Sequence, residues 1–460
     1  MFAPRPGSGV VDHRGQRDSC LCSANVRTAL AALAIGLDRV GRTVKDGELQ
    51  NSSSASYVDP LPPTSDGQLA AEIEDTGKGR RLKTAGLFAG IGGLELGLER
   101  SGHETLFVCD TDPASIAVLE TRFPAVECLR DVRDIDTLPD DTTLLACGFP
   151  CQNLSQAGRT AGIEGSSSSR IGEALRLAEH HGTPWILLEN VPFMLQLDKG
   201  KALHRILGEL ERLGYRWAYR VVDTRAFGLP QRRERVYILA SLEDDPRTVL
   251  FADDCVDRTP DPPWHSVACG FYWTEGNRGL GWAIDAVPPL KSGSGVGIPS
   301  APAVIMPSGN IVTPTITDAE RLQGFPRNWT KPAEGVGRAS FRWRLVGNAV
   351  SVPVAKWIGS RLRRPGIPVV RGSRRLAKNA PWPKVAWNVD GERCTGPLSP
   401  WPKQYKRRHL DELISIDALP LSERATAGFF NRAKASSLKF PEGFLERVEG
   451  YLGRVQNGRQ

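Results

Sequence analysis

One cysteine of this sequence stands where a reactive group would be expected. Cys151 lies in Gly148-Phe-Pro-Cys-Gln-Asn153, directly after the apolar stretch Leu144–Cys147, which is typical of a buried strand. In a parallel sheet, ligands and chemistry collect at the carboxyl ends of the strands. Pro150 restrains the backbone that would present the thiol. A buried, unreactive cysteine is the alternative, but the polar and turn-forming neighbours favour a nucleophile.

A carboxyl group follows a second apolar strand. Glu189 begins Glu-Asn-Val-Pro192 directly after Trp185–Leu188. A carboxyl group held at a strand end near apolar side chains has a raised pKa and can act as an acid. A salt-bridge partner or a helix cap is the alternative role.

Charged residues lead into a further strand, Val236–Ala240, in the run Gln231-Arg-Arg-Glu-Arg235. The guanidinium groups of Arg233 and Arg235 could hold a phosphate or a base edge. A solvated edge is the commoner role of such a charge run.

A glycine-rich turn, Phe88-Ala-Gly-Ile-Gly-Gly93, joins a predicted strand to a predicted helix. Glycines let the backbone approach a ligand closely. Asp110 ends the next strand, where nucleotide-binding folds place the acid that binds ribose hydroxyls. The spacing is not that of a dinucleotide site, and no phosphate-binding lysine follows. We therefore expect a nucleoside ligand without a pyrophosphate, which S-adenosylmethionine satisfies. A purely structural turn is the alternative.

The elements between these residues predict the fold class. Apolar strands at Thr105–Cys109, Leu144–Cys147 and Trp185–Leu188 alternate with helical patterns at Pro113–Thr121, Ile171–His180 and Lys201–Leu213. This alternation predicts an α/β fold whose mostly parallel sheet carries helices on both faces. We expect a catalytic and cofactor-binding domain over residues 81–240.

The remaining chain divides by composition. Residues 1–80 are rich in Ser and Pro near Asn51–Asp66, which predicts a disordered extension. Residues 241–330 are loop-rich with interleaved aromatics and predict a smaller domain. Residues 331–365 contain the apolar segment Gly347–Ile358 and predict a return to the catalytic domain. Residues 366–460 predict a basic C-terminal extension that closes with a helix near Pro441–Leu452.

Charge and cysteine content limit the class of protein. The net charge is +7 over 460 residues, and residues 361–460 carry the excess, with 20 Lys and Arg against 9 Asp and Glu. Nucleic-acid contact and a solvated basic tail remain alternatives for that segment. Nine scattered cysteines argue against a disulfide framework and fit the cytoplasm. No metal-ligand pattern and no membrane segment is predicted.

Taken together, FAGIGG, GFPCQ, ENV, QRRER, RLQGFP and GNAV occur in this order and resemble the bacterial DNA (cytosine-5) methyltransferase family between about Leu82 and Gly359. The resemblance implies an S-adenosylmethionine-dependent, Rossmann-like methyltransferase fold in which the smaller domain is a target-recognition domain. It implies that Cys151 attacks a cytosine extruded from duplex DNA and that Glu189 engages its N3. Arg233 and Arg235 would position the base and support Glu189, and Gln231 would order that strand. The expected cofactor-binding residues are Phe88, Gly90, Gly92, Gly93, Asp110, Asp131, Val132, Asn348 and Val350.

Two departures from the family pattern stand out. Pro314 and Asp318 replace the usual Leu and Glu before Arg321, which puts the geometry of that helix in doubt. The serine run 166–169 makes the match after Cys151 loose. No base that removes the C5 proton is assigned.

Four alternative functions fit the motifs to different degrees. A tRNA cytosine-5 methyltransferase of the same fold is compatible with the catalytic motifs, although the recognition segment and the basic tail favour DNA. A silent DNA-binding regulator is disfavoured by the intact Cys151, Glu189 and Arg233. A nicotinamide oxidoreductase has no use for GFPCQ, and an amino-group methyltransferase needs a motif that is absent. A monomer is expected, and a partner endonuclease stays open.

Overall fold

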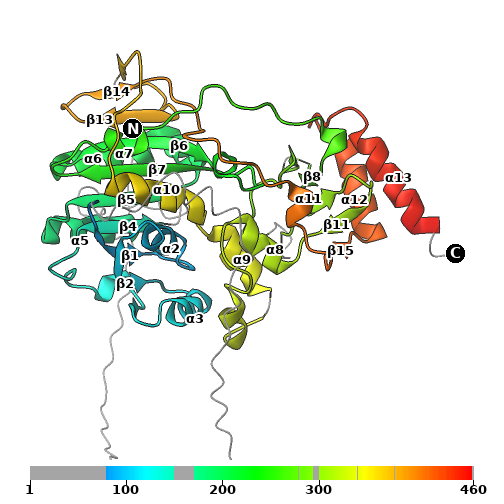
Figure 1. Cartoon of the computed structure of the whole chain (residues 1–460), viewed down its shortest axis with the longest axis horizontal. Helices are drawn as coiled ribbons and strands as arrows, with labels where there is room; N and C mark the ends of the chain where they lie inside the picture. Colours follow the sequence, from blue (N-terminus) through cyan, green and yellow to red (C-terminus); the bar gives the residue numbers. More distant parts are fainter. Residues whose placement is uncertain are drawn as a thin grey trace, which may run out of the picture. The chain divides into compact units, whose positions relative to one another are not determined.

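The computed structural model describes residues 79–149, 170–277, 279–293, 300–338, 340–377 and 379–457. Two sheets organise these residues (Figure 1). The larger has ten strands: β1 (Lys83–Leu87), β2 (Glu104–Cys109), β3 (Glu127–Leu129), β4 (Leu144–Gly148), β5 (Trp185–Asn190), β6 (Arg216–Asp223), β7 (Glu234–Ser241), β12 (Arg374–Arg375), β13 (Val385–Asn388) and β14 (Arg393–Thr395).

The strand order of the large sheet is β12-β14-β13-β6-β7-β5-β4-β1-β2-β3. The five strands from β5 to β3 are mutually parallel, as the alternating sequence pattern predicts. The strands from β7 outward pair antiparallel. The carboxyl ends of β1, β2, β4 and β5 therefore lie along the same edge of the sheet. Because β7 is antiparallel to β5, the first residues of β7 lie at that edge too.

Helices cover both faces of this sheet. One face packs α5 (Arg170–His181) and α6 (Lys201–Arg212) against side chains such as Leu145 and Ile186. The other packs α2 (Gly93–Glu99), α7 (Arg247–Leu250) and α10 (Val352–Arg363) against side chains such as Leu144 and Trp185. The predicted α/β architecture with helices on both faces is confirmed.

A third apolar cluster joins α3 (Pro113–Arg122), α8 (Ile316–Leu322), α9 (Phe341–Asn348) and α11 (Leu410–Leu413). Helix α3 begins at Asp112, whose side chain accepts a hydrogen bond from the Ala114 amide, with Pro113 in the first helical position. This cluster connects the catalytic sheet to the second, smaller sheet.

The smaller sheet has five short strands, in the order β15-β11-β10-β8-β9. They are β8 (Cys269–Phe271), β9 (Trp282–Ile284), β10 (Ala303–Ile305), β11 (Ile311–Thr313) and β15 (Leu419–Pro420). Helices α12 (Glu423–Lys434) and α13 (Phe444–Asn457) cover it. The ring centroid of Phe271 lies 4.3 Å from that of Phe429 and 5.7 Å from that of Phe444, so aromatic side chains form this core.

The segment that the sequence predicts as a basic extension, residues 366–460, contributes to both sheets. Strand β13 pairs with β6, and β14 and β12 follow at the edge. Arg393 fixes this edge by a two-pronged ion pair with Glu211, with Nε–Oε1 2.8 Å and Nη2–Oε2 2.6 Å. Farther on, β15, α12 and α13 complete the small sheet.

A short local motif shapes three turns of the fold. In each, an Asp side chain accepts the backbone N–H of an Arg two residues later, at 2.9–3.0 Å, and the guanidinium of that Arg binds back to the carboxylate. The pairs are Asp131–Arg133, Asp223–Arg225 and Asp245–Arg247. The pairing satisfies a free N–H at the start of a helical turn.

Within the described ranges, none of the helices has the length and apolar character needed to cross a membrane.

Candidate active site

The glycine-rich turn follows β1 at the edge where the parallel strands end. Phe88, Gly90 and Gly92 have φ angles of 54°, 59° and 78°, so three residues of this turn are left-handed. The Asp110 carboxylate accepts the Gly90 amide at 2.8 Å and the Asp112 amide at 2.9 Å. Burial raises the pKa of Asp110, while these two hydrogen bonds oppose the rise. Asp110 therefore holds the turn in shape.

The space around the three glycines differs. A Cβ on Gly92 would lie 2.4 Å from the Phe123 ring, and one on Gly93 would lie 2.5 Å from the Val350 carbonyl oxygen. A Cβ on Gly90 would meet nothing within 4 Å. Gly92 and Gly93 are thus required by packing, and open space remains beside Gly90, where the ligand is expected.

Asp131 and Val132 follow β3 at the same edge. Asp131 caps the 3-10 helix η1 (Val132–Asp134), and Val132 is buried. The Arg133 guanidinium donates to the Asp131 carboxylate, with Nε–Oδ1 3.0 Å, and this hydrogen bond lowers the pKa of Asp131 to about 2. Asp131 is therefore ionised and able to accept further hydrogen bonds.

Glu189 occupies the end of β5, directly beside Gly148 at the end of β4. The Arg235 Nε lies 3.2 Å from Glu189 Oε1 in a nearly buried ion pair. Burial raises the pKa of Glu189, and the nearby Arg235 and Arg233 lower it in part. Glu189 is therefore a salt-bridge partner of Arg235, and its raised pKa is compatible with the expected role as an acid.

The next residue, Asn190, forms a hydrogen bond with the backbone that follows β4. Its side-chain amide donates to the Phe149 carbonyl at 2.9 Å, and its side-chain oxygen accepts the Val191 amide at 2.8 Å. Cys151 itself lies outside the described residues, as do Pro150 and residues 166–169. The chain that carries the thiol therefore leaves β4 beside Glu189.

A neighbouring cysteine offers a contrast to Cys151. Cys147 lies inside β4 and is completely buried, and burial strongly raises the pKa of its thiol. A thiol in that environment stays protonated and unreactive.

Arg233 makes contacts different from those expected of a base-positioning group. It is buried, and its guanidinium donates to three carbonyls: Leu290 at 3.1 Å, Gly347 at 3.2 Å and Ala349 at 2.7 Å. Arg233 thus holds the GNAV segment and Leu290 close to the start of β7. Within the described residues, Arg235 is the arginine that forms an ion pair with Glu189.

Two buried glutamines connect three of the sequence motifs. Gln231 donates to the Leu322 carbonyl at 2.9 Å and accepts the Leu290 amide at 2.9 Å. Gln323 donates to the Val346 carbonyl at 2.9 Å and accepts from the Ser351 hydroxyl at 2.9 Å. The two side chains meet at 3.1 Å. The sequence analysis missed Gln323, although its place in RLQGFP was the available signal.

Asn348 and Val350, the two expected cofactor residues of the GNAV segment, differ in their exposure to solvent. Asn348 ends α9 and is exposed, whereas Val350 is buried against α2. The Val350 carbonyl approaches Gly93, as described above, so the GNAV segment closes on the glycine-rich turn.

The helix whose geometry was in doubt is regular. Thr315 caps α8: its hydroxyl accepts the Asp318 amide at 3.2 Å, and the Asp318 carboxylate accepts the Thr315 amide at 2.9 Å. Asp318 thus completes a capping box in place of a Glu.

One buried acid near the cofactor turn was not predicted. Glu95 in α2 is fully buried, and neither of its carboxyl oxygens has a hydrogen-bond partner within the described residues. A Cβ on Gly86 would lie 2.3 Å from Glu95 Oε1, so the carboxyl group packs directly on β1. Burial raises the pKa of Glu95 to about 8.

Known proteins resemble this chain over most of its length. A family model for C-5 cytosine-specific DNA methylases matches residues 82–262. The type II methyltransferase M2.BsuMI of Bacillus subtilis (strain 168) is 46% identical over 381 residues, which is 80% of this chain and 97% of that protein. The type II methyltransferase M.DsaV of Dactylococcopsis salina is 28% identical over 317 residues, covering 62% and 86% of the two chains.

Among solved structures, the S. pombe Dnmt2 methyltransferase is 18% identical and covers 61% of this chain and 98% of its own, with a TM-score of 0.43. That score is too low to carry an argument, so the assignment depends on the sequence relatives. Since the relative at 46% identity is matched over nearly its full length and the family model matches the catalytic segment, the chain belongs to the C-5 cytosine-specific DNA methylase family.

Proposed function

We propose that this protein transfers a methyl group from S-adenosylmethionine to C5 of cytosine in duplex DNA, as the modification enzyme of a type II restriction–modification system. The observation that carries the proposal is the buried Glu189–Arg235 pair beside the strand end that leads to Cys151. The relatives named above are type II methyltransferases, which supports the biological setting.

The proposed cofactor residues fit S-adenosylmethionine chemically. Open space lies beside Gly90, and the carboxylates of Asp110 and Asp131 stand at the same edge as hydrogen-bond acceptors. We assign ribose hydroxyls to Asp110 and the adenine amino group to Asp131. Phe88, Gly92, Gly93, Val132, Asn348 and Val350 would line the same site. When bound there, S-adenosylmethionine supplies the methyl group as an electrophile.

In the proposed reaction, the Cys151 thiolate forms a bond to C6 of the cytosine, and negative charge develops towards N3. A protonated Glu189 donates a hydrogen bond or a proton at N3 and stabilises that charge. Burial favours the protonated form, and Arg235 keeps the carboxyl group oriented. After methylation at C5, loss of the C5 proton expels Cys151.

The cytosine must leave the base stack before C6 is accessible, at a cost of about a few kcal/mol. We propose that the small sheet is the target-recognition domain that offsets this cost through contacts with the grooves and phosphates. Residues 419–457 belong to it together with residues 269–313, because β15, α12 and α13 complete its sheet and core. We further propose a cytoplasmic monomer that shares its target sequence with an endonuclease.

The test is methyl transfer from labelled S-adenosylmethionine to duplex DNA and to tRNA in parallel, with Cys151→Ser as the control. We expect label on cytosine C5 of DNA only. Duplexes that carry 5-fluorocytosine should trap a covalent adduct that survives denaturation. Transfer to tRNA alone, or an adduct formed equally by Cys151→Ser, would refute the proposal.

A further inference from the structure

A segment of the C-terminal region runs along the connection between the two sheets. We call residues 401–413 the strap. The Tyr405 amide donates to the Ala226 carbonyl at 3.0 Å, and the Arg408 amide donates to the Gly228 carbonyl at 3.1 Å. Gly228 has φ 79°, and a Cβ there would lie 2.6 Å from the Lys406 carbonyl oxygen. The strap therefore lies directly on the turn that follows β6 of the catalytic sheet.

The strap reaches the small sheet at Asp285, the residue after β9. Asp285 has φ 47°, and its side chain is fully buried. Its carboxylate accepts the Leu410 amide at 2.9 Å and lies 2.9 Å from His409 Nδ1. Its own amide donates to the Ala268 carbonyl at 2.8 Å. Asp285 is thus the point at which the small sheet is attached to the strap.

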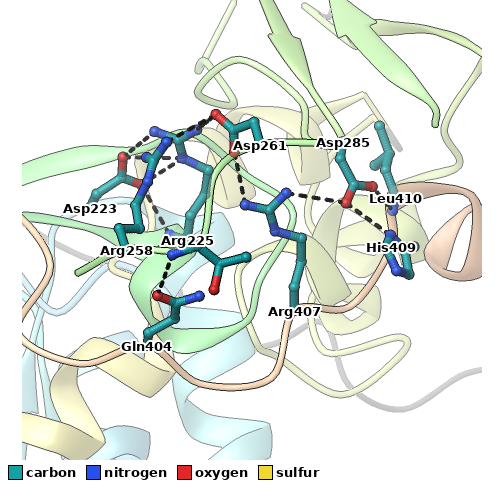
Figure 2. Close-up of polar contacts among 10 residues, drawn as sticks. Asp223, Arg225, Arg258, Asp261, Asp285, Gln404, Arg407, His409 and Leu410 are labelled. Carbon is teal, nitrogen blue, oxygen red and sulfur yellow. Dashed lines mark hydrogen bonds and ion pairs between the residues drawn. The ribbon is translucent and has the colours of Figure 1, made fainter. Parts of the chain in front are cut away.

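Arg407 connects this anchor to the catalytic side. Its Nη2 donates to Asp261 Oδ1 at 2.8 Å, and its Nη1 lies 3.7 Å from Asp285 Oδ2. Figure 2 shows Arg407 between the two carboxylates. The other strap contacts described above reach either the turn after β6 or Asp285, whereas the Arg407 guanidinium contacts both Asp261 and Asp285.

Asp261 also contacts two arginines, one of which lies next to the large sheet. Arg258 Nη2 lies 3.2 Å and Arg225 Nη1 lies 3.8 Å from Asp261 Oδ2. Arg225 in turn forms a two-pronged pair with Asp223, the last residue of β6. Alternating charges therefore extend from β6 to β9, as Figure 2 shows.

A second attachment lies nearer to the active site. Arg232 donates its amide to the Val287 carbonyl at 2.9 Å, and Gln231 and Arg233 hold Leu290. These contacts come from the segment directly before β7, the strand that carries Arg235. Together with the apolar cluster that connects the two sheets, these two separated polar attachments fix the orientation of the small sheet.

We propose that Arg407 is a positioning residue for the DNA substrate: by bridging Asp261 and Asp285 it fixes the orientation of the small sheet relative to Glu189 and Arg235. The inference rests on the proposed function, because it takes the small sheet to be the part that reads DNA. Arg407 acts through the sheet it holds and touches neither the cofactor residues nor Glu189.

Removing the guanidinium has a defined physical effect. Asp285 keeps His409 and the Leu410 amide, so its carboxylate stays partly satisfied, but its charged link to Asp261 is lost. Coupled neighbouring charges typically contribute about threefold to thirtyfold to an equilibrium constant. None of the expected cofactor residues is among the contacts that the structure describes for Arg407, Asp261 or Asp285, so we expect cofactor binding to be independent of this link.

The test compares Arg407→Ala with Lys406→Ala in the full chain. Lys406 is exposed in the same strap, and its side chain makes no polar contact within the described ranges, so it is the matched control for lost charge. We expect Arg407→Ala to raise KM for duplex DNA by about threefold to thirtyfold and to leave the affinity for S-adenosylmethionine unchanged. Arg407→Lys, which keeps the positive charge, should raise KM for DNA less than Arg407→Ala does. Lys406→Ala should behave as the wild type.

Amide hydrogen exchange of the same variants gives a readout that needs no catalysis. Arg407→Ala should speed exchange in residues 282–290 and 405–413 while β1 and β4 stay protected. Equal KM for DNA and equal exchange in the two variants would overturn the inference, as would loss of cofactor binding in parallel with DNA binding. A wild-type protein that neither binds nor methylates DNA would refute the proposed function instead, and the exchange comparison would still decide whether Arg407 holds the small sheet.

Discussion

The buried Glu95 makes the stability of this protein depend on pH in a way that one substitution should remove. Both carboxyl oxygens lack hydrogen-bond partners within the described residues, and burial raises the pKa from 4.5 to about 8. Glu95→Gln keeps the shape of the side chain and cannot ionise. A Gln amide would meet the same apolar contacts, so the neutral forms should be similar in stability.

The sign follows from proton linkage. Between the unfolded pKa of 4.5 and the folded pKa of about 8, the unfolded chain releases a proton that the folded protein retains. The stabilisation due to Glu95 is therefore complete below the unfolded pKa and decreases as pH rises to the folded pKa. From about pH 6 to about pH 8 the loss amounts to about 2 kcal/mol.

Urea denaturation of wild type and Glu95→Gln at these two pH values measures this difference. We expect Glu95→Gln to be more stable than the wild type by about 2 kcal/mol at the lower pH and by about 4 kcal/mol at the higher pH, because the loss begins at the unfolded pKa of 4.5. Glu127→Gln, which neutralises an exposed glutamate on β3, should follow the wild type at both. Parallel pH profiles for wild type and Glu95→Gln would show that Glu95 is ionised in the folded protein, and the reasoning would be wrong.

Three further predictions concern the active site and the small sheet. Glu189→Gln should lower kcat for methyl transfer by about 10²- to 10⁴-fold with unchanged cofactor affinity, measured by labelled transfer and calorimetry; a kcat within a factor of about two of wild type would contradict its role at N3. Arg233→Ala should lower the free energy of unfolding by about 3 to 5 kcal/mol, because three carbonyls lose the hydrogen bond from a buried guanidinium, and denaturation curves that coincide with those of the wild type would count against this. Deleting residues 418–460 should abolish DNA binding in a mobility-shift assay and spare cofactor binding, because it removes α12 and α13 from Phe271; retained DNA binding would place the reading surface elsewhere.

The sequence predicted the fold class because the parallel half of the large sheet obeys a simple pattern. Strands β2, β4 and β5 are apolar runs separated by helices, and the expected site residues Asp110 and Glu189 lie at the ends of β2 and β5. The regularity of α8 was harder to foresee, since the usual Glu is an Asp. The capping box forms because the Asp318 carboxylate still reaches the Thr315 amide.

Contacts between residues far apart in the sequence could not be predicted from the local sequence pattern. Strand β13 (Val385–Asn388) lies in a segment that looks like a basic tail, and its pairing with β6 and β14 makes it a strand. The contacts of Arg233 with the carbonyls of Gly347 and Ala349 join residues more than one hundred positions apart. A charge run gives no sign of such burial, so the backbone contacts of Arg233 could not be predicted, and its expected role in positioning the base stays a prediction.

The division of the small sheet along the chain has a consequence for synthesis of the protein. Strands β8 to β11 come from residues 269–313, but β15, α12 and α13 that cover them come from residues 419–457. A ribosome releases the chain from its N-terminus, and domains generally fold as units. The parallel strands can pair while translation continues, whereas Phe271 stays uncovered until residues 419–457 have been synthesised. A chain interrupted before residue 419 would therefore contain every strand of the large sheet but would leave the aromatic core around Phe271 open on one side.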